Sequence, residues 1–483
     1  MRRGVCRVAR LGVALGSLVL GSLGARAETL QEALTLTYQT NPDLAAERAR
    51  LREVDEDVSQ ANAKWRPSLA LEGEIERVSE SVKKKSGKFD YRTQSWSADL
   101  VATQPLFTGG RNSAEKRGAL ARVEGARARL RVREQRVLLD AVRAFVDVAR
   151  NEAVLDLVRQ DLLLLQDLLK DVRERQEKTQ ATESDVDQTV AALEAARALC
   201  IANLAELRDS WRAYEQIVGS VPALAAAPEG DRRINACLDA KSERLRSAIV
   251  MPEELPAAPA SLDEVEAAVQ GSVPELDAAR AEEEETRYAV SAAYAELLPT
   301  AEITARLGTS GEEFDPTSIT REASIGAEFV IPIFNNGSEW SEIRAARERN
   351  NRARLSITSS QRQITRDAVR AWYDLVSIRA IRAVNKMQAA SVQRAFEGLR
   401  KEMADPKLHR SMTDLLGLRQ AALGTRSLLI ASDRDEAVAL YRLLASMGKL
   451  NAAFLQLPVQ VYDAEANTKT QAKRVIGDSI QGE

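Results

Sequence analysis

The longest regular pattern of apolar and polar residues in this chain of 483 residues lies between Leu155 and Val172. Its apolar positions follow one another at alternating steps of three and four residues, which is the spacing of a coiled-coil seam. Because no proline occurs between Pro105 and Pro222, we predict one helix over 111–177, roughly 100 Å long at about 1.5 Å per residue. The seam residues are Leu155, Val158, Leu162, Leu165, Leu169 and Val172.

The same arrangement occurs twice along the chain. Residues 104–110 (QPLFTGG) form a corner before the first long helix, and residues 331–337 (IPIFNNG) repeat that corner about 227 positions later. Behind the corners, 141–148 (AVRAFVDV) returns as 368–375 (AVRAWYDL) at the same spacing. A repeat at a fixed spacing indicates a duplicated structural unit. The predicted units span 28–218 and 261–450, and the second has its own long helix over 338–403.

Two segments in each half alternate between apolar and polar residues, which predicts β-strands. In the first segment Leu69, Leu71 and Ile75 lie on one face, opposite Glu72 and Glu74. Such segments are typical of outer-membrane strands with one face toward lipid, although a half-buried antiparallel sheet alternates in the same way. The export signal described below favours membrane strands. The predicted strands are 67–79, 94–105, 299–309 and 323–333, with polar loops at 83–88 and 308–322.

Shorter helices flank these strands and long helices. At about 1.5 Å per residue, two short helices placed end to end nearly match one long helix, so we expect each long helix to pack along two short ones, with a seam midway. The predicted short helices occupy 29–64, 183–218, 262–297 and 411–448. Two segments follow neither pattern, 219–260 and the tail 451–483, and they are either linkers or a collar at the seam.

The first 27 residues have the features of a secretory signal peptide. Arginines precede an apolar run over 11–23, and Ala25-Arg26-Ala27 matches a cleavage site that would leave Glu28 as the new N-terminus. No cysteine suited to lipid attachment follows the run, and no later segment approaches 18 apolar residues. The sequence thus predicts an exported protein of the periplasm, the outer membrane or the medium.

Two cysteines remain after the predicted cleavage, Cys200 and Cys237. In an oxidising compartment they either form a disulfide or lie apart as two small core residues. We take the disulfide as the hypothesis to test.

Composition and motifs argue against catalysis and nucleic-acid binding. The net charge of −3 indicates no polyanionic partner. His409 is the single histidine, so a zinc site has too few ligands, and no phosphate-binding loop, dinucleotide fingerprint or nucleophile elbow occurs. The acidic run 282–285 is typical of a solvated helix face. We predict no enzyme activity, no cofactor and no metal.

Taken in order, these features resemble the TolC family of outer-membrane efflux and secretion channels, over about 28–450. The resemblance rests on Leu30 and Leu34 with Asn41-Pro42, on Pro67 and Pro299 before the strands, on both corners, and on the hairpin-tip segments 182–186 and 410–416. It implies a mainly helical fold with a small transmembrane β part. Four strands per chain would contribute to a twelve-stranded trimeric barrel in outer-membrane lipid, on a long periplasmic barrel of coiled-coil helices.

The resemblance also implies partners and a role. The partners would be two further copies in a homotrimer, a periplasmic membrane-fusion adaptor and an inner-membrane pump of the RND or ABC type. The role would be a passive exit duct in efflux or type I secretion. The competing interpretation is a periplasmic coiled-coil scaffold without a pore.

The family closes its duct with charged residues at the hairpin tips. Position by position, Asp185 and Arg410 match an aspartate–arginine contact, and Asp414 matches an aspartate of the ring at the aperture. A second ring aspartate is replaced here by Gly417, and the second tip carries the unusual segment 405–407 (DPK). We therefore expect a periplasmic gate made of Asp185, Arg410 and Asp414.

Overall fold

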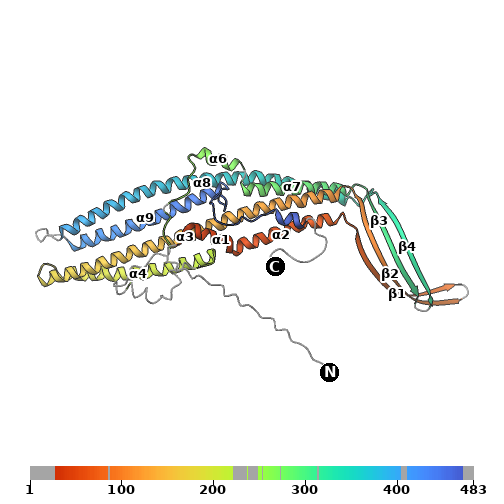
Figure 1. Ribbon diagram of the computed structural model, residues 1–483, viewed down its shortest axis with the longest axis horizontal. Coiled ribbons are helices and arrows are strands. Elements are labelled where there is room, and N and C mark those ends of the chain that lie inside the picture. The colour runs from red at the N-terminus through yellow and green to blue at the C-terminus, as the bar shows by residue number, and fades with distance from the viewer. Residues whose placement is uncertain are drawn as a thin grey trace, which may run out of the picture.

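The computed structural model describes residues 28–471, apart from 85–86, 221–236, 238–248, 253, 272, 313–314 and 404–410. The predicted signal peptide and the last part of the tail lie outside this description. The described chain is a long rod of helices with a four-stranded sheet at one end and two helical hairpins at the other (Figure 1).

The two halves of the chain contain the same elements in the same order. In the first half these are α1 (Leu30–Thr40), α2 (Pro42–Ala63), β1 (Ser68–Lys84), β2 (Gly87–Thr108), α3 (Arg111–Glu177) and α4 (Glu183–Val218). In the second they are α6 (Leu262–Gln270), α7 (Pro274–Ala295), β3 (Thr300–Glu312), β4 (Asp315–Val330), α8 (Ser338–Glu402) and α9 (Met412–Ser446). The short helix α10 (Ala466–Gln471) follows.

Local signals set where the helices begin. Thr29 and Glu32 form a capping box that starts α1, and the side chain of Asn41 accepts hydrogen bonds from the first turn of α2. The two long helices instead start directly after a glycine, Gly110 with φ of 86° and Gly337 with φ of 80°. Only glycine adopts this left-handed conformation at little cost, so the glycine fixes the corner between strand and long helix in both halves.

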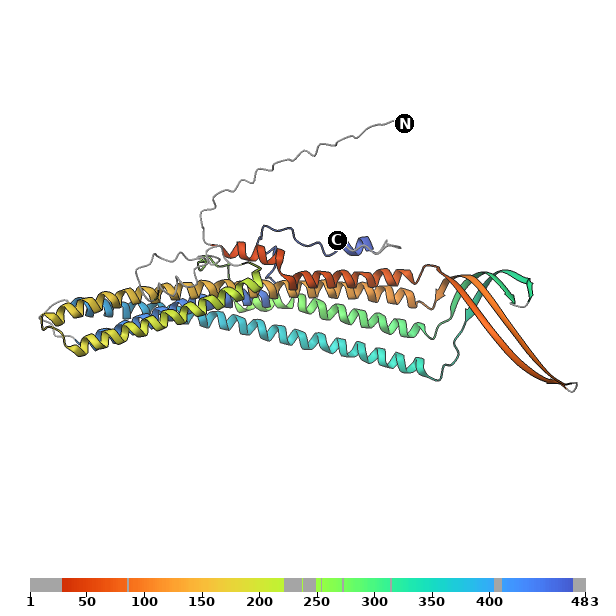
Figure 2. The ribbon, with the colours of Figure 1, turned by 90° about the horizontal axis from the view of Figure 1, so that it is seen from below.

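The long helices organise the rod, with 67 residues in α3 and 65 in α8. As predicted from their lengths, α3 lies along α2 and α4, and α8 lies along α7 and α9 (Figure 2). The predicted seam of α3 is confirmed, because all six of its residues are buried and Leu165 has no exposed surface. The largest apolar cluster follows α3 from the junction of the short helices toward the hairpins.

The strands form one antiparallel sheet in the order β1-β2-β3-β4, and they are longer than predicted. The predicted loop over 308–322 is wrong, because β3 continues to Glu312 and β4 begins at Asp315. The first hairpin, with a predicted loop over 83–88, is paired as far as Lys84 and Gly87. Backbone hydrogen bonds between strands need no apolar alternation, so pairing continues through the polar outer part of each hairpin.

At its other end, β4 is shorter than the predicted 323–333, because it ends at Val330, two residues before Pro332. Proline has no backbone N–H to give to a neighbouring strand, which is consistent with the strand ending before it.

The pairing register confirms the predicted apolar face of the sheet. Leu100 lies opposite Leu71 on one side and opposite Leu307 on the other, and directly paired residues share a face. In a single chain this face is bare, since Leu71 is 80% exposed and Ile325 is 79% exposed. An apolar face of this extent indicates contact with lipid or with another protein.

On the polar face of the sheet, Asp99 lies 4.0 Å from Arg306 and is paired with Gly308. A Cβ atom added to Gly308 would lie 2.1 Å from the Oδ1 atom of Asp99. The glycine therefore leaves the space into which the aspartate side chain extends.

The described part of the inserted segment 219–260 docks against the middle of the rod. Ile249 pairs with Glu28 in a parallel bridge, and its backbone N–H donates to the Oε2 atom of Glu152 on α3, 3.2 Å away. The hydroxyl of Tyr214 on α4 donates to the Oε1 atom of Glu28 at 2.8 Å. Of the two predicted alternatives, these residues therefore form a collar around the rod and are not a free linker.

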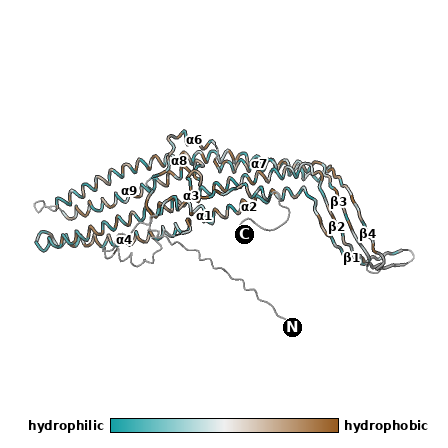
Figure 3. The backbone as a smooth tube through the Cα atoms, in the orientation of Figure 1, coloured by the Kyte–Doolittle hydropathy of each residue, from teal (hydrophilic) through white to brown (hydrophobic). Residues whose placement is uncertain are grey.

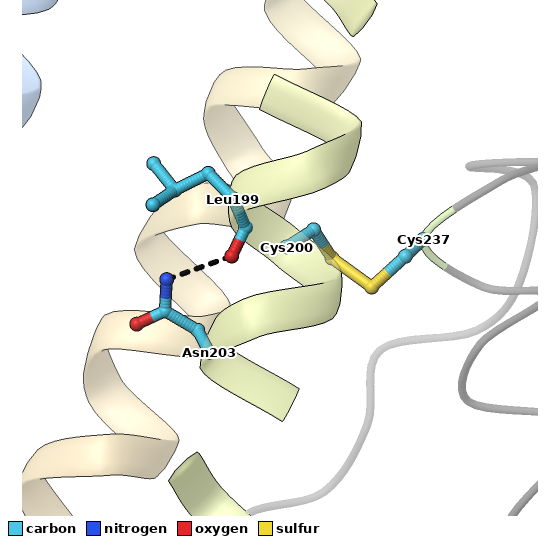
Figure 4. Close-up of a disulfide and its surroundings, with 4 residues drawn as sticks. All are labelled: Leu199, Cys200, Asn203 and Cys237. Atoms are coloured by element: carbon cyan, nitrogen blue, oxygen red, sulfur yellow. Dashed lines mark hydrogen bonds between the residues drawn. A yellow bond between two sulfur atoms is a disulfide. The ribbon is translucent and has the colours of Figure 1, made fainter. Parts of the chain in front are cut away.

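A disulfide joins Cys200 on α4 to Cys237 in the inserted segment (Figure 4). The two Cα atoms are 5.8 Å apart and the residues are separated by 37 positions. A cross-link that closes a loop of this size stabilises a fold by about 3–4 kcal/mol, chiefly by restricting the unfolded chain. It holds part of the collar against α4.

The C-terminal tail lies along the outside of α2 (Figure 2). Asp55 on α2 is 1% exposed, and its carboxylate accepts hydrogen bonds from Asn467 and Thr468 on α10, each at 2.6 Å. Both oxygens of a buried carboxylate are thereby satisfied, which offsets its desolvation. The tail as far as Gln471 is therefore an ordered strap rather than a free end.

The disulfide gives a direct chemical prediction. When the denatured, unreduced protein is treated with iodoacetamide, mass spectrometry should find Cys200 and Cys237 unlabelled, and both labelled after reduction. Cys237→Ser should lower the unfolding free energy by about 3–4 kcal/mol. Labelling of both residues before reduction would contradict the disulfide.

Candidate functional site

The two helical hairpins, α3 with α4 and α8 with α9, end close together at the end of the rod farthest from the sheet (Figure 1). At the first tip, Thr182 and Asp185 form a capping box for α4. The Oδ2 atom of Asp185 accepts from the backbone N–H of Thr182 at 2.9 Å and from its hydroxyl at 2.8 Å. In return, the backbone N–H of Asp185 donates to the hydroxyl of Thr182 at 3.2 Å, so the cap satisfies two backbone donors that have no partner within the helix.

The predicted gate residues are placed only in part. Asp185 is half-buried at the start of α4, and its carboxylate is held by its own helix cap. Asp414 is exposed in the first turn of α9. Arg410 lies outside the described residues, so the structure shows no contact among the three.

A different contact, which the sequence did not indicate, joins the two tips. The hydroxyl of Thr413 on α9 donates to the Oε1 atom of Gln188 on α4, 2.9 Å away. Beneath it a small apolar cluster contains Val172, Phe396 and Met412, from three of the four hairpin helices. The tips are therefore held by a modest polar contact on a small apolar base.

Farther from the tips, toward the middle of the rod, Arg419 on α9 and Asp161 on α3 form a buried ion pair. Their side chains are only 9% and 7% exposed. Burial raises the pKa of Asp161, and the neighbouring guanidinium opposes this shift. The pair connects one hairpin to the other through the interior of the rod, where breaking it would leave an unpaired charge.

The sequence of α9 carries a signal for one member of this pair. The buried positions Met412, Leu415 and Ala422 share a stripe with Arg419. A charged residue within an apolar stripe needs a partner when it is buried. The identity of that partner, Asp161, could not be read from the sequence because it lies 258 positions away.

Nearer the sheet, charged side chains tie the helices of the two halves together. Arg122 on α3 donates to Asp57 on α2 at 2.7 Å and to Glu285 on α7 at 2.8 Å. Its hydrogen bond to Asp57 is the main reason why its pKa is raised, although partial burial opposes the shift. These residues border a cavity of about 420 Å³ between α2, α3, α7 and α8.

Within the described residues, no group of three or more His, Cys, Asp or Glu side chains is placed to hold a metal ion. The described helices include none that is both long enough and apolar enough to cross a membrane. Figure 3 shows polar and apolar residues mixed along the helices.

An apolar-faced sheet on a long helical rod with paired hairpin tips defines a class of protein: outer-membrane channels that extend into the periplasm. The outer membrane efflux protein family model matches residues 33–220 and 268–449, so each half of the duplication is matched separately. The chain belongs to this family.

A relative agrees with this assignment in sequence, and two solved structures share the fold. The chain is 27% identical to the outer membrane efflux protein BepC of Brucella suis over 96% of this chain and 95% of that protein. The crystal structure of the CmeC outer membrane channel of Campylobacter jejuni superposes with a TM-score of 0.73 at 14% identity, covering 97% and 98% of the two chains. The outer membrane protein VceC of Vibrio cholerae gives a TM-score of 0.68 at 17% identity, covering 87% and 96%.

The buried ion pair leads to a stability prediction. Arg419→Met should destabilise the protein by about 3–5 kcal/mol, because it leaves the Asp161 carboxylate buried without its partner. The double variant Asp161→Leu with Arg419→Met should recover most of this loss. Urea titration followed by circular dichroism measures both effects, and equal losses in the single and double variants would show that the pair does not couple the hairpins.

Proposed function

We propose that three copies of this chain assemble into an exit duct across the outer membrane and the periplasm. The observation that carries the proposal is the pair of free edges in the single chain. Within the described residues β1 and β4 each pair on one side only, and a free strand edge in lipid leaves backbone groups unsatisfied at several kcal/mol each. Closure of the sheets of three chains into one barrel removes every edge.

The helical rod has free edges at matching positions. In the part of the rod toward the hairpin tips, α4 packs along α3, α3 along α9, and α9 along α8. Although α4 also touches α9, as at Gln188 and Thr413, α4 and α8 are the two outer helices. The outward face of α8 carries an exposed apolar stripe, in which Val384 is 63% and Met387 is 72% exposed. This stripe consists of Tyr373, Val376, Ala380, Val384 and Met387.

The outward face of α4 offers a complementary surface. Exposed alanines recur there at steps of four, three and four residues, at 191, 195, 198 and 202. Large side chains of one helix fit against small ones of the next when apolar residues follow this coiled-coil spacing. We therefore place α8 of each copy against α4 of its neighbour, which closes the helices into a ring.

This assembly is tested by a charge on the α8 stripe. Val384→Asp should convert the trimer into monomers in detergent, because it would bury an unpaired carboxylate at each contact. Lys386→Asp is the matched control. Lys386 lies one turn after Arg382, whose Nε–H donates to Asp433 of α9 at 2.5 Å, so it is on the α9 side of α8 and not on the stripe. Analytical ultracentrifugation measures the oligomeric state of both variants. A trimer that survives Val384→Asp would exclude this interface.

The duct would receive its substrates from other proteins. The family name and the relative BepC are both described as outer-membrane efflux proteins, which supports a tripartite system with a membrane-fusion adaptor and an inner-membrane pump. The pump is of the RND type in efflux or of the ABC type in type I secretion, and both fit the same duct. A poreless periplasmic scaffold leaves the bare apolar face of the sheet without a role.

We further propose that the hairpin tips form the gate, with Arg410 and Asp414 toward the aperture. Asp185 is already engaged in its helix cap, so a bond to Arg410 would be shared with that cap or replace it. Contacts near a surface are worth about 0.2–1 kcal/mol each. One such contact in each of three copies gives a closure free energy of about 0.6–3 kcal/mol, which the binding of a partner is able to shift.

Conductance in a planar lipid bilayer tests both the duct and its gate. The wild-type trimer should show a low resting conductance, and Arg410→Ser should raise it while ultracentrifugation still finds a trimer. Asp414→Asn should reduce cation selectivity, because carboxylates that line an aperture favour cations. If none of these proteins conducts, the duct is excluded, whereas conductance unchanged by Arg410→Ser rejects only the gate.

A further inference from the structure

A second cavity, of about 240 Å³, lies between α3, α8 and α9 in the part of the rod toward the hairpin tips. It is smaller than the pockets of drug-sized ligands, which measure roughly 300–1,000 Å³. Its apolar wall includes Leu157, Phe396 and Leu423. Its polar lining residues are three arginines, two acids and two glutamines: Arg400, Arg419, Arg426, Asp161, Glu397, Gln160 and Gln393.

The carboxylates in this cavity already have donors. Asp161 is paired with Arg419, and Glu397 accepts a hydrogen bond from the amide of Gln393 at 2.8 Å. Acceptors that already have donors contribute less to binding a further cation. The polar wall therefore favours an incoming group that accepts hydrogen bonds over one that donates them.

The guanidinium groups, in contrast, retain unused donors. Arg419 as a whole residue, backbone included, is 8% exposed. Its Nε–H is buried without a hydrogen-bond partner among the described residues. An unsatisfied buried donor costs free energy, which a ligand oxygen would recover on binding. Arg400 and Arg426 are exposed at the same cavity, and within the described part of the chain neither has an ion-pair partner.

From this arrangement we propose that the cavity binds a small amphiphile with a carboxylate head. The head would accept from the Nε–H of Arg419, flanked by Arg400 and Arg426, because arginine forks match carboxylate geometry. The apolar body would lie against Phe396 and Leu423. The site connects α3 of one hairpin to α8 and α9 of the other, so its occupant would contact both hairpins at once.

Calorimetric titration of the purified protein in zwitterionic lipid nanodiscs tests this site with octanoate as the probe. Octanol has the same tail without charge, and octyltrimethylammonium has the opposite charge. We expect saturable binding of octanoate, and clearly weaker binding of the other two. The measurement does not depend on conductance, so its outcome is separate from that of the proposed duct.

Three variants assign the binding to this cavity. Arg426→Gln lies at the exposed rim and should weaken octanoate binding about threefold. Arg419→Lys keeps a charge for Asp161 but removes the Nε–H fork, and should weaken binding about tenfold. Arg394→Gln, on an exposed part of α8 outside the cavity, is the matched control and should leave binding unchanged.

Each alternative outcome is decisive. Equal affinity for octanol and octanoate would mean a simple apolar cleft, and equal weakening by Arg394→Gln and Arg426→Gln would mean non-specific attraction to a basic surface. Absence of saturable octanoate binding would also overturn the proposal. Should Arg419→Lys fail to fold, the rim variant Arg426→Gln and a second one, Arg400→Gln, still distinguish these outcomes.

Discussion

Unsatisfied backbone hydrogen bonds at the two sheet edges are the constraint on which the rest of this structure depends. A sheet of four strands has no way to pair its outer N–H and C=O groups within one chain, and lipid offers no water to replace a neighbouring strand. The apolar face carried by Leu71, Leu100 and Ile325 makes lipid the favoured surrounding for that sheet. The proposed closure of the edges by identical copies rests on these two observations together.

The rod continues directly from the sheet. Each long helix begins at a left-handed glycine, Gly110 or Gly337, directly after the strand and its corner. Because both long helices start at a left-handed glycine, α3 and α8 leave the sheet in a similar way. Toward the hairpin tips, α4 and α8 are the two outer helices of the chain. The collar and the C-terminal strap reinforce the middle of the rod, where the short helices end.

The interactions that join the helices differ along the rod, from the sheet to the hairpin tips. Near the sheet, Arg122 links α2, α3 and α7 through two short ion pairs. In the part of the rod toward the hairpin tips, the buried pair of Arg419 and Asp161 joins the two hairpins. At the tips only the Thr413–Gln188 hydrogen bond and a small apolar cluster connect them within the described residues. The local stability of the fold is therefore expected to be lower at the tips, where it rests on few contacts, which supports the proposed gate there.

Local patterns determined much of this fold. The steps of three and four residues on α3, the glycine corners and the duplication gave the lengths and the order of the helices, because each depends on neighbours within a few positions. Strand faces were also predictable, since side chains alternate with a period of two. The ends of the strands were not, because pairing through polar residues depends on the partner strand rather than on the segment itself.

The candidate site needed the tertiary structure. Asp185 was predicted at a tip as a gate residue, and the folded chain shows that its carboxylate caps its own helix, for which Thr182 three positions earlier is a local signal. The partners of Arg419 and Thr413 lie 258 and 225 positions away, and no local period encodes a contact over such distances. The sequence by itself thus determined which elements form and which faces are apolar. Which charges meet, and where a cavity opens between helices, was decided by the packing of distant segments.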